Sequence, residues 1–233
     1  MKIKGLEKVS LIDYPGKIAC TIFLFGCNFK CGFCHNPELV LKEEGRNFPE
    51  KEILEFLEKR KNQLNGVCIT GGEPLLTLEK DFLKKIKNLG YSIKIDTNGT
   101  GPEKLKEFIS GGLIDFVSMD IKSRKEDYPL VANSNVDMEK IEESIKIISE
   151  MENYEFRTTI VPGIHDEENI KEMCLWIEEV IGKKAKKFYL QGFKNQGKFI
   201  NPEFNSTIDT EEDFLKKLKI TADKHFLSGG IRI

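Results

Sequence analysis

The sequence lacks any long run of apolar residues. Its longest apolar stretch is far shorter than the roughly 20 residues that a membrane-spanning helix needs. The first residues carry the charges of Lys2, Lys4, Glu7 and Lys8 where a signal peptide has an apolar core. These features predict a cytoplasmic protein with no membrane partner, in which cysteine thiols stay reduced.

An excess of charge of one sign is also missing. The 233 residues include 36 lysines and arginines against 38 aspartates and glutamates, a formal net charge of −2. Proteins that bind nucleic acid mainly by electrostatics carry a basic surplus, so no nucleic-acid partner is predicted. The lysines of residues 183–187 are interpreted as a solvated helix end followed by a turn. Histidine is scarce, and His165 and His225 are expected to be solvated or helix-end side chains without a role.

What the sequence does contain is a regular alternation of two patterns. Six short apolar, strand-like segments alternate with segments whose apolar residues recur every three or four positions, as Phe82, Leu83 and Ile86 do. Parallel neighbouring strands need such crossover connections, so the predicted fold class is α/β, a partial (β/α)6 barrel of parallel strands with outer helices. The predicted strands are 18–25, 67–70, 91–97, 114–119, 155–161 and 186–191, and the last predicted helix is 211–226.

No Ser/Gly-rich linker, low-complexity tract or change in composition divides the chain. A chain of this length can bury a substantial core as one domain. We therefore expect a single domain over residues 1–233, with residues 1–17 as an N-terminal extension packed on the barrel.

Three of the six cysteines follow the first predicted strand directly. Cys27, Cys31 and Cys34 have the spacing C-x-x-x-C-x-x-C. Closely spaced thiolates suit the iron ions of a 4Fe-4S cluster, whose usual complement is four cysteines. The fourth ligand is missing here, which would leave one iron open to a ligand from outside the protein. A single cluster is predicted, because the chain has no second group of closely spaced cysteines.

The remaining cysteines and the neighbouring histidine define an alternative. Cys20, Cys68 and Cys174 lie in apolar segments and are interpreted as small buried side chains rather than ligands. A structural zinc site would combine the three clustered cysteines with His35. Zinc ligands usually come from separated pairs, and His35 directly adjoins Cys34, so we disfavour zinc.

Polar residues also follow the later predicted strands. Gly71-Gly72-Glu73 follows the second strand, Asp96 begins the segment 96–99 at the end of the third, and Asp120 and Lys122 follow the fourth. In barrels of this type, chemistry gathers on the loops after the carboxyl ends of the strands, so these residues are expected to share one mouth with the cysteines. Taken alone, Asp120 and Lys122 also fit an ordinary surface ion pair, and Gly-Gly-Glu-Pro fits an ordinary turn.

These motifs resemble those of the radical S-adenosylmethionine (SAM) enzymes. The cysteine motif, with Phe33 before its last cysteine, resembles the signature of that superfamily, and Gly71-Gly72-Glu73-Pro74 resembles its glycine-glycine-glutamate motif. Over nearly the whole chain, other motifs resemble the glycyl-radical-enzyme activating subfamily, most closely the activating proteins of anaerobic ribonucleoside-triphosphate reductase, with pyruvate formate-lyase activating enzyme a near relative. Those motifs are residues 9–16, 34–36, 96–99, 120–122 and 161–163.

The resemblance implies a radical reaction. SAM would be cleaved reductively at the 4Fe-4S cluster to a 5'-deoxyadenosyl radical, which would abstract hydrogen from a glycine of a partner glycyl radical enzyme, namely anaerobic ribonucleotide reductase. A flavodoxin- or ferredoxin-type protein would donate the electron. The alternatives are a radical SAM enzyme acting on a small molecule and, less favoured, a non-enzymatic iron-sulfur or zinc protein. No catalytic residue beyond the cluster and cofactor is implied.

The resemblance also implies roles for single residues around the methionyl part of SAM. The backbone of Gly71 and Gly72, with Glu73 and Asp96, would lie near the methionyl ammonium group, and Lys122 would pair with the methionyl carboxylate.

Other matching positions would surround the rest of the cofactor. Asp120 would lie near the ribose, Phe33 and His35 would border the adenine, and Arg157 would face the same cavity. Lys194 takes the position of a cofactor-side histidine in the related pattern Phe-His-x-Met-Gly-Lys, which implies a changed contact there. Positions matching Asp96, Thr97 and Asp120 imply a monovalent cation site.

Overall fold

The computed structural model of the protein describes residues 1–233. The chain forms two compact units. Unit 1 comprises Met1–Asn28, Glu38–Thr97 and Glu103–Val117, and unit 2 comprises Phe29–Pro37, Asn98–Pro102 and Ser118–Ile233. The 3-10 helix η1 (Pro37–Leu39), helix α4 (Pro102–Ser110) and strand β5 (Phe116–Asp120) contain points where the chain passes from one unit to the other.

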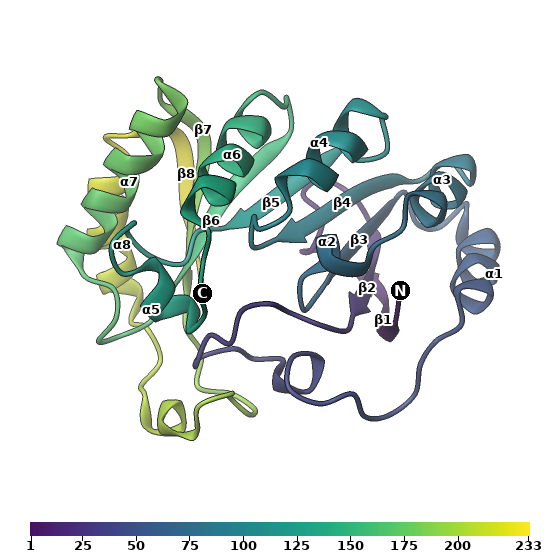
Figure 1. Cartoon of the computed structure of the whole chain (residues 1–233), viewed down its shortest axis with the longest axis horizontal. Coiled ribbons are helices and arrows are strands. Elements are labelled where there is room, and N and C mark those ends of the chain that lie inside the picture. Colours follow the sequence, from purple (N-terminus) through teal and green to yellow (C-terminus); the bar gives the residue numbers. More distant parts are fainter. The chain divides into compact units, whose positions relative to one another are not determined.

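Unit 1 contains a four-stranded arrangement of β1 (Ile3–Ser10), β2 (Ala19–Leu24), β3 (Gly66–Gly71) and β4 (Ser92–Thr97). Strand β1 runs antiparallel to β2, and β2, β3 and β4 pair in parallel in that order. The other helices of this unit are α1 (Glu50–Arg60), α2 (Pro74–Thr77) and α3 (Lys80–Asn88), of which α3 packs on β4 and α1 packs against α3 (Figure 1).

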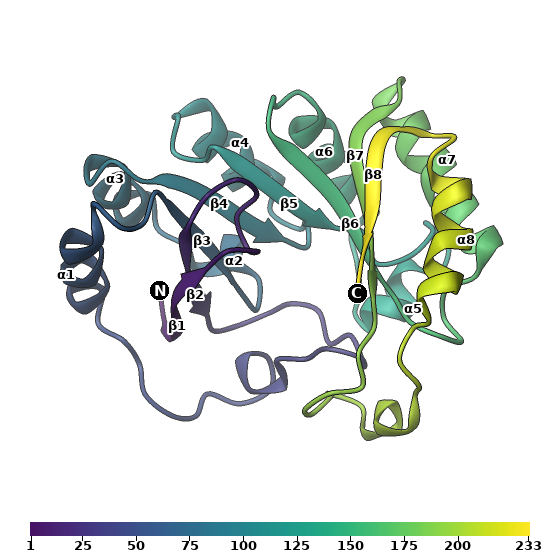
Figure 2. The same cartoon turned by 180° about the vertical axis from the view of Figure 1, so that it is seen from behind.

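Unit 2 contains the parallel strands β6 (Tyr154–Ile160), β7 (Ala185–Gly192) and β8 (Phe226–Arg232), with β7 paired to both of the others. Its helices are α5 (Tyr128–Ala132), α6 (Met138–Ser149), α7 (Glu167–Ile181) and α8 (Glu212–Ala222), with a 3-10 helix η2 (Pro202–Ser206). Helix α8 packs on β7, β8 and α7, as the view from behind shows (Figure 2).

Local sequence explains how the helices begin, end and face the sheet. Phe82, Leu83 and Ile86 of α3 are buried, as their spacing predicts. Asp166 caps the start of α7 by accepting a hydrogen bond from the Asn169 backbone amide. None of the helices has the length and apolarity that crossing a lipid bilayer requires.

The six predicted strands are present as β2 to β7, but two further strands were missed. Residues 3–10 of the expected N-terminal extension form β1, which pairs with β2. The prediction of a helix over 211–226 is wrong at its end, because α8 stops at Ala222 and Phe226 starts β8. Phe226 stacks on Phe188 of β7 with ring centroids 4.6 Å apart, so tertiary pairing decides the conformation of this segment.

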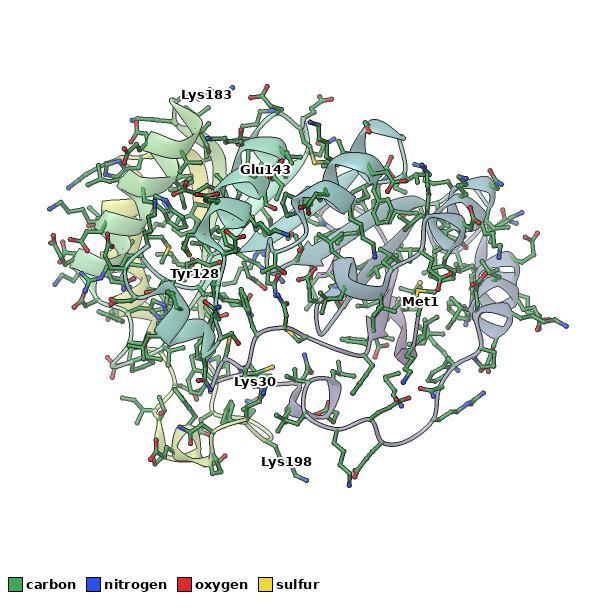
Figure 3. All side chains as sticks on the ribbon, viewed as in Figure 1. Met1, Lys30, Tyr128, Glu143, Lys183 and Lys198 are labelled. Carbon is green, nitrogen blue, oxygen red and sulfur yellow. The ribbon has the colours of Figure 1, made fainter.

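The segment after β5 includes the short helix α5. Lys183 lies exposed just after the end of α7 (Figure 3), as the interpretation of a solvated helix end predicts. Lys186 and Lys187 belong to β7 instead. The single domain over residues 1–233 stays a prediction.

Candidate active site

The Gly71-Gly72 pair packs against the chain that leads into Cys27, within unit 1. The Gly72 amide donates to the Leu24 carbonyl at 2.9 Å, and the Glu73 amide donates to the Gly26 carbonyl at 2.7 Å. A Cβ atom on Gly72 would lie 2.0 Å from the Gly26 oxygen, and Gly71 has a φ of +122°. Only glycine allows this approach and this conformation. The pair is therefore required for the backbone path of the cysteine loop, a reason that sequence analysis missed.

Glu73 is buried and links the ends of β3 and β4. It is 1% exposed, and its Oε1 accepts hydrogen bonds from the Leu75 amide at 3.0 Å and from the Thr97 hydroxyl at 2.8 Å. The first of these bonds caps the start of α2. The carboxylate predicted to lie near the cofactor thus also has a structural function.

Asp96 lies beside a buried lysine that sequence analysis did not identify. The Lys94 ammonium contacts the Asp96 carboxylate, and Lys94 is 1% exposed. Its Nζ also lies 3.7 Å from the sulfur of Cys68. Cys68 is the residue of β3 that pairs with Lys94 of β4. The available signal was a lysine between two isoleucines, Ile93 and Ile95, in a predicted strand.

Cys31 and Cys34 lie on one turn in unit 2, where the Cys34 amide donates to the Cys31 carbonyl at 3.0 Å. Cys31 is buried, and burial raises the pKa of its thiol, whereas the nearby positive charge of Lys122 acts in the opposite direction. Electrostatic interactions also reach Cys31 from Cys34 and Asp120. Residues 31, 34, 120 and 122 are therefore electrostatic neighbours within this unit.

Asp120 is the centre of a three-residue ion cluster. Arg157 Nε donates to Asp120 Oδ1 at 2.6 Å, and Lys122 Nζ lies 3.5 Å from Oδ2. Burial alone would raise the pKa of Asp120, but the charges of Arg157 and Lys122 outweigh it and hold the pKa well below its usual range. Because all three side chains are at most a quarter exposed, the cluster is not the ordinary surface pair considered for Asp120 and Lys122.

The backbone that carries this cluster is held by side chains from three other segments. The carbonyl of Asp120 accepts from the Tyr128 hydroxyl at 3.3 Å, and that of Ile121 accepts from the Thr158 hydroxyl at 2.9 Å. Tyr128 belongs to α5 (Figure 3). The carbonyl of Lys122 lies 2.9 Å from Nε2 of His165. These contacts fix the positions from which Asp120 and Lys122 project.

His165 is not the solvated or helix-end histidine that we expected. It is 3% exposed, and its Nδ1 accepts a hydrogen bond from the Val161 amide at 3.0 Å, so the proton on Nε2 faces the Lys122 carbonyl. Burial lowers the pKa of the imidazole. His225 lies 2.7 Å from Glu178, just after α8.

Phe33 and His35 lie in an aromatic cluster of unit 2. The Phe33 ring meets the Phe204 ring edge-on at 6.0 Å, and the His35 ring lies 5.6 Å from Phe193 and 5.2 Å from Phe199. The phenylalanines that follow β7 were missed by sequence analysis, although their repetition after position 192 was a visible signal.

Lys194, predicted to take the place of a cofactor-side histidine, lies near an acidic side chain. Its Nζ is 3.6 Å from Asp209 Oδ2, and its side chain is 36% exposed. The contact of Lys194 with a cofactor stays a prediction.

The isolated cysteines are buried, as predicted. Cys20, Cys68 and Cys174 have no exposed surface. Burial raises the pKa of the Cys20 and Cys174 thiols to about 12, which makes both poor sources of thiolate.

Charged and polar side chains at the carboxyl ends of parallel strands characterise a cofactor-binding α/β enzyme. Residues 21–177 match the family model described as the Radical SAM superfamily, which is more than half of the chain. The chain therefore belongs to the radical SAM superfamily of enzymes. Membership implies a 4Fe-4S cluster and SAM as cofactors.

Two curated relatives are similar over most of this chain. A protein of Methanocaldococcus jannaschii, provisionally named a glycyl-radical enzyme activating enzyme, is 35% identical over 96% of this chain and 92% of its own. The pyruvate formate-lyase-activating enzyme of Clostridium pasteurianum is 31% identical over 77% of each chain.

Solved structures agree with the predicted fold class. SuiB of Streptococcus suis bound to S-adenosylmethionine matches 91% of this chain with a TM-score of 0.67 and 16% identity, and this chain spans about half (51%) of SuiB. A domain of a pyruvate-formate lyase-activating enzyme from Bacteroides vulgatus matches 72% of this chain and 98% of its own, with a TM-score of 0.54 and 20% identity. The fold is thus α/β, with parallel strands in a sheet that does not close.

Proposed function

We propose that this chain activates a glycyl radical enzyme by generating the radical that removes a hydrogen atom from a glycine of that partner. The observation that supports this most strongly is the similarity over nearly the whole chain to a protein provisionally named a glycyl-radical enzyme activating enzyme. Similarity to a pyruvate formate-lyase-activating enzyme over three quarters of the chain supports the same class of partner.

Cys27, Cys31 and Cys34 are the proposed ligands of the cluster. Thiolates suit iron, and the donors available around this loop fit such a group. Cys31 and Cys34 share one turn, and Gly72 permits the close backbone path before Cys27. The other three cysteines are fully buried, so the proposed set has three ligands and leaves one iron for SAM.

When bound, the cluster and SAM supply a 5'-deoxyadenosyl radical through one-electron reductive cleavage of a carbon-sulfur bond. The residues of the chain bind and orient. Lys122 pairs with the methionyl carboxylate of SAM, and Asp120, kept ionised by Arg157, accepts hydrogen bonds from the ribose.

The other proposed contacts complete the cofactor site. Glu73 and Asp96, with the backbone of Gly71 and Gly72, lie near the methionyl ammonium group. Phe33 and His35 border the adenine, and the aromatic rings that pack around them restrict their motion. Lys194 is a further proposed cofactor contact. For the positive charge at Asp96 there are two candidate sources, an added monovalent cation held with Thr97 and Asp120, or the Lys94 ammonium.

The particular partner that we propose is anaerobic ribonucleoside-triphosphate reductase, with a flavodoxin- or ferredoxin-type protein as electron donor in the cytoplasm. The test is anaerobic incubation of the reconstituted, reduced protein with SAM and the reductase, followed by electron paramagnetic resonance and chromatography. We expect a glycyl radical signal on the reductase and formation of 5'-deoxyadenosine. The matched control is Cys34→Ala, which removes one proposed cluster ligand and should abolish both signals.

The outcomes separate the possible functions. SAM cleavage without a glycyl radical on any glycyl radical enzyme supplied would favour a small-molecule substrate. A glycyl radical on pyruvate formate-lyase alone would change the partner but keep the class of reaction. No 5'-deoxyadenosine above the Cys34→Ala control would refute radical SAM activity of this chain.

A further inference from the structure

A lysine ammonium and a carboxylate lie side by side on one face of β4. Lys94 and Asp96 are two positions apart on a strand, so their side chains point to the same face. The Lys94 ammonium contacts the Asp96 carboxylate, and the two side chains are 2% and 12% exposed. A charge removed from water to this degree is costly unless an opposite charge compensates for it, so each group depends on the other.

The neighbours of this pair do not provide another reason for a buried lysine. The Lys94 Nζ also lies 3.7 Å from the sulfur of Cys68, and a thiol sulfur is a weak acceptor. Asp96 is therefore the group that accounts for the charge of Lys94.

The adjacent hydroxyl faces the other way. Thr97 follows Asp96, so its side chain lies on the opposite face of β4, where its hydroxyl donates to Glu73 at 2.8 Å. A monovalent cation added at Asp96 would have to share the carboxylate with a lysine that already contacts it. Like charges at such short range repel each other in a poorly solvated site.

We propose that Lys94 is a built-in cation of the cofactor site: its ammonium supplies at Asp96 the positive charge that an added monovalent cation would otherwise supply. The inference rests on the proposed function, in which Asp96 lies near the methionyl ammonium group of SAM. Lys94 neutralises and orients this carboxylate before SAM arrives. The binding of SAM by this chain therefore does not depend on Na⁺ or K⁺.

The experiment measures the dissociation constant of SAM by equilibrium dialysis with anaerobically reconstituted protein. Tetramethylammonium chloride, whose cation is too large for a small site, is compared with KCl and NaCl at equal ionic strength. For the natural chain, we expect the same dissociation constant in all three salts. For Lys94→Met, we expect binding weakened by about tenfold in tetramethylammonium chloride and restored by KCl or NaCl, within the range of coupling between two bound ligands.

The control is Lys87→Met. Lys87 pairs with Asp115 at 2.8 Å in the same unit, but both side chains are more than a quarter exposed. This variant loses the same ammonium from a Lys-Asp pair, and we expect SAM binding that is independent of the cation. A second readout is the unfolding temperature of the cluster-free protein in KCl, compared with tetramethylammonium chloride at equal ionic strength. For Lys94→Met, the unfolding temperature should be higher in KCl. For the natural chain and for Lys87→Met, it should be the same in both salts.

Each result has a defined meaning. Cation-dependent SAM binding by the natural chain overturns the inference on Lys94 alone, as does a Lys94→Met variant that binds SAM equally well in every salt. If Lys94→Met does not fold, the natural chain still provides the test, and Lys94→Arg, which keeps the charge, should bind without added cation. Absence of SAM binding by the natural chain in every salt overturns the proposed function and this inference with it.

Discussion

His165 and Lys122, 43 positions apart in the sequence, are joined by a hydrogen bond of 2.9 Å between an imidazole nitrogen and a backbone carbonyl. The other ring nitrogen of His165 accepts from the Val161 amide at 3.0 Å. A neutral imidazole can hold both partners at once, because it has one donor and one acceptor nitrogen. A protonated imidazole has two donors and must lose the bond from Val161.

Stability should therefore fall as the pH falls below about 6.5, the ordinary pKa of histidine. Burial lowers the pKa of His165 in the folded state, so below the ordinary value the unfolded chain binds a proton that the folded chain does not. The loss should grow until the pH reaches the folded pKa and then level off. Urea unfolding at a series of pH values measures this free energy.

The variant His165→Gln removes this titration and should flatten that part of the pH dependence. The control is His225→Gln, which changes a histidine that pairs with Glu178. This variant should still show the loss of stability at low pH that His165 causes. An unchanged slope in His165→Gln would show that another group causes the dependence.

Arg232 and Glu155 should form a strongly coupled pair. The guanidinium donates to the two carboxylate oxygens at 2.8 and 2.7 Å, and the Glu155 side chain is 2% exposed. Arg232→Met leaves a buried carboxylate supported mainly by the Ser118 hydroxyl at 2.9 Å, so we expect a loss of about 3–5 kcal/mol in the free energy of unfolding.

The double variant Glu155→Met/Arg232→Met should regain most of that loss, since no buried charge is left without its partner. Denaturant unfolding of the four proteins of this cycle measures the coupling. A double variant no more stable than Arg232→Met would contradict the assignment of the loss to the unpaired carboxylate.

Gly72→Ala should be much more destabilising than a typical glycine substitution. The new Cβ atom would lie 2.0 Å from the Gly26 carbonyl oxygen, so the chain leading to Cys27 has to move. We expect a loss of about 2 kcal/mol or more, together with reduced iron content after reconstitution.

The matched variant is Gly90→Ala. Gly90 has a φ of +91° and open space around the missing Cβ, so its cost is backbone strain alone, about 1–2 kcal/mol. Its iron content should equal that of the natural chain. Equal iron content in both variants would show that Gly72 is not required for the cysteine loop to bind iron.

Removal of a clustered cysteine should affect iron content, whereas removal of an isolated one should not. After anaerobic reconstitution, Cys31→Ala should lose the visible absorption and most of the iron of the natural chain, because a proposed cluster ligand is gone. Cys174→Ala is the control, since Cys174 is fully buried in α7. Full iron binding by Cys31→Ala would contradict the proposed three-cysteine ligand set.

Much of the fold could be predicted from local patterns. The six apolar segments became β2 to β7, and the spacing of Phe82, Leu83 and Ile86 identified the buried face of α3. Strand β8 was missed because its sequence, from Phe226 to Arg232, contains two glycines and only an interrupted apolar pattern. Its conformation depends on pairing with β7, which is a property of the folded chain.

The sequence by itself determined the chemistry that is available: three closely spaced cysteines after a strand, a Gly-Gly-Glu motif after the next, and charged residues at later strand ends. Only the tertiary structure decided how these groups are supported. Burial makes Lys94 depend on Asp96, and it makes His165 a neutral support of the Lys122 backbone. Spacing along the chain shows which residues share a face, but the loss of water around a charge arises only when other segments cover it.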